Sequence, residues 1–243
     1  MGKQQLLNMN TIAKIISSLS LTALLWAMGC QTSVKPEPET NPTSSSTSSA
    51  PGFGTSKARP EGQPFVWPTG VNVLGKPKME YECMANAVTQ KRQYGSGGAV
   101  RFCLTLYNSN AQSVTIKFPP GIIWIAETSN DIEPAQNGII LKPVLISVPA
   151  NSQITVMLDS FCINLDRDPT NYGDSYEPQP IVTQHSGMLE LSQLVARKRI
   201  NTEEREKTLP SADWATLQNA VHEVEKAGHV SDESRRELAA LPE

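Results

Sequence analysis

Apolar residues recur in short runs between residues 70 and 165, and Pro, Gly and Asn separate the runs. In residues 99–107, Phe102, Leu104 and Leu106 occupy alternate positions, which is the period of a strand with one buried face. A short turn separates residues 99–107 from the next apolar run, residues 113–118, so these two segments are expected to pair as a hairpin. The polar, Gly-rich residues 91–98 are expected to form a loop. The whole pattern predicts strands at residues 71–74, 79–84, 99–107, 113–118, 122–126, 139–141, 144–148 and 154–158.

Turn signals every eight to twelve residues are typical of an all-β domain. A parallel sheet would need helices between its strands, and the pattern of this region shows none. We therefore predict an immunoglobulin-like antiparallel β-sandwich over residues 65–185, with closure into a barrel as the alternative.

Residues 186–243 change to the helical period and are predicted to form a C-terminal helical segment. Ser186, Ser211 and Ser231 are each placed to cap a helix, and Gly228 is placed to end the second one. The second helix carries an apolar stripe formed by Trp214, Leu217, Val221 and Val224. The stripe is expected to dock onto the protein's own sandwich. The alternative is a helix that docks into the groove of a partner protein.

The first 29 residues carry two lysines and no acidic residue, and they end in the apolar run 15–28. This arrangement is typical of a secretory signal peptide. A helix of this run would span about 21 Å, which is short of the roughly 30 Å hydrocarbon core of a bilayer. Residues 31–64 are rich in Ser, Thr and Pro and predict a disordered tether before a folded domain.

The stretch LLWAMGC, from Leu24 to Cys30, resembles the lipobox of bacterial lipoproteins. The resemblance implies cleavage after residue 29 and a diacylglyceryl thioether on Cys30, so that membrane lipid is the first expected partner. Gln31, rather than Asp, follows the cysteine, and in this family that choice implies sorting to the outer membrane of the cell envelope. The alternative is an ordinary secreted protein whose cysteine follows the signal peptide by coincidence.

Composition limits the remaining functions. Removal of residues 1–29 takes 21 basic residues to 19 against 24 acidic ones, a net charge near −5. No clustered Lys/Arg pattern accompanies this charge, so no nucleic-acid partner is expected. Beyond Cys30, the chain holds Cys83, Cys103 and Cys162. An oxidising compartment permits one disulfide in three ways, with a preference for a pair that includes Cys103 or Cys162, and three buried free thiols are the alternative.

Candidate chemistry is sparse. Acidic and hydroxyl residues in the window 166–177 stand at the oxygen-ligand positions of a calcium loop, but a solvated acidic loop is favoured and no metal site is predicted. His185, His222 and His229 lack zinc-site spacing. The segment 94–98 contains Ser96 between glycines, out of register with the nucleophile elbow of hydrolases.

Trp67, Trp124 and Trp214 would form a carbohydrate or peptide platform if they were exposed, and Trp67 is the one expected at the surface. No cofactor is predicted, and no catalytic residue is assigned. The sequence favours a non-catalytic binding or scaffolding module, anchored through Cys30 and with scope for a protein partner. Two rivals remain, an envelope hydrolase without a located active site and an assembly subunit that binds a partner through its C-terminal helices.

Overall fold

A computed structural model describes residues 50–127, 134–205, 207 and 209–243. These residues belong to one compact unit, 45–243. Cys30 and the predicted signal peptide, residues 1–29, lie outside the described residues. Within them, the fold is mainly β with antiparallel sheets and a minority of helix, as predicted at that level. A search of the described part finds no helix that is both long and apolar enough to cross a membrane.

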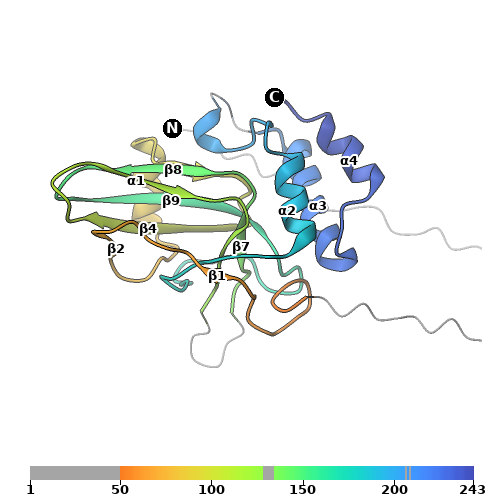
Figure 1. Cartoon of the computed structure of the whole chain (residues 1–243), viewed down its shortest axis with the longest axis horizontal. Helices are drawn as coiled ribbons and strands as arrows, with labels where there is room; N and C mark the ends of the chain where they lie inside the picture. The colour runs from red at the N-terminus through yellow and green to blue at the C-terminus, as the bar shows by residue number, and fades with distance from the viewer. Residues whose placement is uncertain (1–49, 128–133, 206, 208) are drawn as a thin grey trace, which may run out of the picture. The chain divides into compact units, whose positions relative to one another are not determined.

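Most strands belong to one large, curled sheet (Figure 1). One further strand, β3 (Gln93–Gly95), pairs in parallel with β9, so part of the predicted 91–98 loop is a strand. The other described pairings are antiparallel. The order of the large sheet is β1 (Gln63–Pro64), β10 (Ile181–Val182), β6 (Ile122–Trp124), β7 (Gly138–Ile140), β9 (Ser152–Cys162), β4 (Val100–Asn108) and β2 (Val71–Val73).

The predicted hairpin between residues 99–107 and 113–118 is wrong. β4 pairs with β9 from Val100↔Ser160 to Asn108↔Ser152, whereas β5 (Val114–Phe118) pairs with β8 (Val144–Val148) in a second sheet. The buried Asn108 directs this crossing. Its amide Nδ2 donates to the Gln112 carbonyl at 2.8 Å and to the Val148 carbonyl at 3.1 Å, which fastens the end of β4 to the second sheet.

The predicted strand at residues 79–84 is also wrong, because the chain forms helix α1 (Tyr81–Thr89) there. The apolar residues of this segment fit two periods, and the alternation at residues 79, 81 and 83 competes with a helical stripe at 81, 84, 85 and 88. A disulfide between Cys83 and Cys103 of β4, with Cα atoms 6.4 Å apart, ties the helix to the sheet. Cys162 is free and buried.

Two cores stabilise the unit, one on each side of the large sheet. The first lies between β4, β9 and the β5–β8 sheet and contains Phe102, Phe118 and Trp124. The second lies between the sheet and three helices, α2 (Ser186–Leu194), α3 (Ser211–Ala227) and α4 (Asp232–Ala239). These helices lie together beside one end of the long strands (Figure 1). The apolar stripe of α3 therefore packs against the protein's own sheet and helices.

The folded unit includes residues that composition assigns to the tether. Phe53 is buried and its ring lies 4.8 Å from the ring of His185, while residues 63–64 form β1. At the helix ends, His185 rather than Ser186 caps α2, because its Nδ1 accepts from the Met188 N–H. Ser231 caps α4 as predicted. Gly228 ends α3 as predicted, with the positive φ of 79° that favours glycine.

Candidate functional site

The candidate calcium-ligand positions in residues 166–177 do not converge. Glu177 forms an ion pair with Arg59 at 2.6 Å, and Asp174 accepts a bond of 2.6 Å from the backbone N–H of Asn171. The Thr170 hydroxyl lies 2.6 Å from the Tyr176 hydroxyl and is buried. Among the residues that the structure describes, no three His, Cys, Asp or Glu side chains are grouped as metal ligands. The loop uses its polar groups on itself and on its neighbours.

The other sequence candidates are also separated. His185 caps α2 and burial lowers its pKa, His222 lies within α3, and the exposed His229 contacts the Ala227 carbonyl. Ser96 is only 2% exposed, and its hydroxyl has no hydrogen-bond partner among the described residues. The neighbouring Gly97 fits because a Cβ there would lie 2.4 Å from the Ser160 carbonyl oxygen. This serine is part of a tight turn against β9.

The three tryptophans do not make a common platform. Trp124 is fully buried in the first core, and Trp214 is half-buried against the second. Trp67 was expected at the surface, but it is half-buried with its ring centroid 5.0 Å from that of Phe65 and 5.8 Å from that of Phe118. Its neighbour Val66 is the exposed residue, at 85%.

A polar cluster that the sequence does not reveal lies where β3, β4 and β9 meet. Asp159 is 3% exposed, and its carboxylate accepts from Arg101 Nε at 2.6 Å and from Gln93 Nε2 at 2.5 Å. Arg101 and Asp159 are direct cross-strand partners, and Gln93 reaches them from the parallel strand β3. A buried carboxylate needs such partners, because an unpaired charge is costly to desolvate.

A groove of about 570 Å³ opens beside this cluster, and we call it the β4–α3 groove. Gln93 and Arg101 line it with hydrogen-bond donors, and Trp214 and Leu209 line it with apolar surface. Ser211, at the start of α3, also lines the groove. Segment 201–205 closes the edge, because the backbone N–H of Gly95 donates to the Glu203 carboxylate at 2.8 Å. The groove thus combines apolar surface with hydrogen-bonding side chains, as small-molecule sites do.

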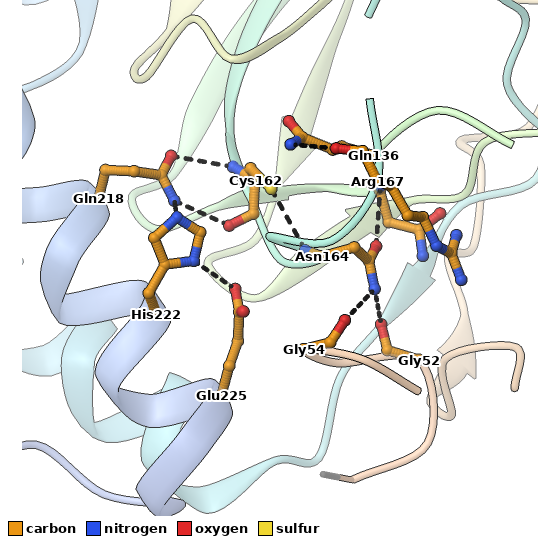
Figure 2. A network of polar contacts seen from close by, with 10 residues as sticks. Gly52, Gly54, Gln136, Cys162, Asn164, Arg167, Gln218, His222 and Glu225 are labelled. Carbon is orange, nitrogen blue, oxygen red and sulfur yellow. Dashed lines mark hydrogen bonds and ion pairs between the residues drawn. The ribbon is translucent and has the colours of Figure 1, made fainter. Parts of the chain in front are cut away.

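A second polar network surrounds Cys162 at the end of β9 (Figure 2). The strand β4 begins at Val100, opposite Ser160, so Cys162 lies beyond its reach. Cys162 faces Gly138 of β7, but the ladder bond there runs from the Ile163 N–H to the Asn137 carbonyl, which leaves the Cys162 backbone groups for another partner. Gln218 of α3 takes that place. Its Oε1 accepts from the Cys162 N–H at 3.1 Å, and its Nε2 donates to the Cys162 carbonyl at 2.9 Å.

We call these two hydrogen bonds between Gln218 and Cys162 the Gln218 clamp. They determine which nitrogen of the neighbouring His222 ring carries the proton. Because Oε1 of Gln218 faces a backbone N–H, its Nε2 is a donor and lies 3.1 Å from His222 Nε2, which must accept. His222 therefore carries its proton on Nδ1 and donates it to Glu225 Oε1 at 3.1 Å. Burial raises the pKa of Glu225, and the bond from His222 lowers it in part.

The Cys162 thiol in this network is not prepared for catalysis. Burial raises its pKa to about 12, although Sγ accepts a bond of 3.2 Å from the Asn164 N–H. Asn164 in turn donates to the Gly52 carbonyl at 2.8 Å, which holds the start of the folded unit against β9 (Figure 2). The network joins three parts of the fold, and its role is structural.

Comparisons with known proteins leave the site to be interpreted from its own geometry. The chain matches no protein-family model, no curated protein and no solved structure.

Proposed function

We propose that this protein is a membrane-anchored lipoprotein of the bacterial cell envelope, sorted to the outer membrane, and that its folded unit is a non-catalytic binding module. The observation that carries the anchor is the stretch from Leu24 to Cys30, followed by the Ser/Thr/Pro-rich residues 31–49. A diacylated cysteine holds a protein stably, because each buried CH₂ contributes about 0.8 kcal/mol.

The β4–α3 groove is the proposed ligand site of the module. Its carboxylate, Asp159, already has two partners, so it serves to hold Arg101 and Gln93 in place and is not free to act as a general base. A groove lined by fixed donors and by Trp214 and Leu209 suits a ligand with polar edges and an apolar face. An N-acetylated oligosaccharide has both, and its acetamido carbonyls accept hydrogen bonds from guanidinium and amide groups.

An immunoglobulin-like form of the module stays part of the proposal. It is supported by the way the β5–β8 sheet faces β4 and β9 across a shared core. The rival role, assembly through the C-terminal helices, would need an exposed apolar stripe on α3. Leu217, Val221 and Val224 of that stripe are instead fully buried within the chain. Deleting residues 201–243 would therefore remove seven of the nineteen buried residues of the second core, and point variants are the better probes.

Cys30→Ala tests the anchor, with Cys162→Ala as a matched cysteine control. The wild type and the control should sediment with membranes and show the mass of a diacylglyceryl group, whereas Cys30→Ala should be neither processed nor lipidated. A Cys30→Ala chain that is fully processed and still membrane-bound would refute the anchor.

Ser211→Tyr tests the groove by filling it. An NMR titration of the 45–243 unit with an N-acetylglucosamine oligomer should shift the amides of residues 93–101, and Ser211→Tyr should abolish the shifts. Asn219→Tyr is the matched control, because Asn219 is exposed on the same helix and does not line the groove. If the wild type shows no shifts, or if Ser211→Tyr binds like the control, the groove is not the site.

A further inference from the structure

Helix α1 presents an apolar stripe to solvent. Tyr81 is 70% and Val88 59% exposed, and Ala85 lies between them at helical spacing. Such an arrangement is unusual, because the apolar stripe of a helix is normally its buried side. The opposite side of α1 holds the buried Ala87 and the disulfide from Cys83, so the helix cannot rotate to hide the stripe.

A second aromatic residue extends this surface from a distant part of the chain. Tyr172 is 62% exposed, and its ring centroid lies 6.1 Å from that of Tyr81. Two backbone bonds fix the turn that carries it, from the Gly173 N–H to the Met79 carbonyl at 3.0 Å and from the Met79 N–H to the Asp174 carbonyl at 3.0 Å. We call Tyr81, Ala85, Val88 and Tyr172 the α1 face.

We propose that the α1 face lies in the interfacial region of a lipid bilayer, the membrane that carries the anchor. Tyrosines concentrate at membrane interfaces, because the ring enters the apolar boundary while the hydroxyl stays hydrated. Exposed Lys78 and Lys91 flank the two ends of the helix, where their long side chains can reach lipid headgroups. Glu80 is paired with Lys78 at 2.5 Å, Glu82 is exposed on the same helix, and the Asp174 carboxylate accepts from the Asn171 N–H.

The length of the chain before the folded unit supports this occupant. Residues 31–49 provide 19 residues between Cys30 and Ala50. A segment of 19 residues would span about 24 Å on average as a coil and about 65 Å if extended, whereas a unit of this size is roughly 40 Å wide. Any face of the unit can therefore meet the bilayer, and tethering raises its effective concentration there. The inference rests on the proposed anchor only for this proximity.

The test uses the unlipidated 45–243 unit, a compact unit with both cores, so that it does not depend on Cys30. The unit should co-sediment with phosphatidylethanolamine/phosphatidylglycerol vesicles at millimolar lipid. Tyr81→Ser combined with Val88→Ser should lower the partition coefficient roughly tenfold. Val66→Ser combined with Leu145→Ser, two exposed apolar residues elsewhere, should leave it unchanged.

Two results would overturn the proposal. One is a wild-type unit that does not bind the vesicles, or that loses binding equally in both variants. The other is a change from dimer to monomer in Tyr81→Ser/Val88→Ser by sedimentation equilibrium, which would assign the α1 face to a second copy of the chain. Unchanged thermal melting of both variants excludes unfolding as the cause. A failed anchor would show in the Cys30→Ala experiment and would leave this partition measurement unaffected.

Discussion

Replacement of Gln218 by Leu should destabilise the folded unit strongly, although the change is between side chains of similar size. The substitution leaves the buried N–H and C=O of Cys162 without partners and removes the bond to His222 Nε2. Each unsatisfied buried backbone group costs about 1–3 kcal/mol, and the added apolar burial offsets about 1 kcal/mol. We expect a net loss of about 3 kcal/mol in the free energy of unfolding, or about 10 °C in Tm for a unit of this length.

Urea denaturation followed by tryptophan fluorescence measures this loss, and calorimetry gives the Tm. The matched control is Gln153→Leu, because Gln153 is a glutamine of β9, the strand that Gln218 contacts, but is exposed. The control should stay within about 0.5 kcal/mol of the wild type. If Gln218→Leu falls in the same narrow range, the amide clamp does not hold α3 to the end of β9, and the interpretation of Figure 2 is wrong.

Three further outcomes are expected of the 45–243 unit. Because burial raises the pKa of Cys162 to about 12, a thiol reagent should not modify the native protein at pH 8. After unfolding without reductant, the reagent should modify one thiol per chain. Rapid labelling of the native protein would contradict the burial of Cys162. Burial also raises the pKa of Glu225, so the unfolded chain releases that proton at lower pH than the folded one. Stability should therefore fall as the pH rises above the ordinary carboxyl range, and a Glu225→Gln variant that kept the same slope would refute the assignment. Cys83→Ser with Cys103→Ser opens a link with a sequence separation of 20 and should lower the free energy of unfolding by about 3 kcal/mol in a urea titration; an equal stability would show that α1 contributes little.

The positions of the long strands and of the C-terminal helices could be predicted, but their partners could not. The alternation in residues 99–107 identifies one buried face of β4, and any strand with a matching face can pair with it. β4 joins β9, more than forty residues later, because the end of β4 crosses to the second sheet through Asn108. Register of this kind depends on the whole core, which no local pattern contains.

The strand prediction for residues 79–84, where the chain forms helix α1, was wrong for a related reason. Its apolar residues fit a period of two over residues 79–83 and a helical period over residues 81–88, so the sequence alone does not decide between them. The disulfide to Cys103 favours the helix, because Cys83 then faces β4 while Tyr81 and Val88 face solvent on the other side of α1. The pairing itself was one of three that composition left open.

The sequence by itself determined features that depend on neighbouring residues. These are the mainly β class, the end of α3 at Gly228, the cap of Ser231 and the resemblance around Cys30. Only the tertiary structure decided the β4–α3 groove, the Gln218 clamp and the α1 face. In each of these, the interacting groups come from segments far apart in the chain, as with Gln93, Arg101 and Asp159. Local preferences act over a few residues, whereas burial and hydrogen-bond satisfaction select the distant partners.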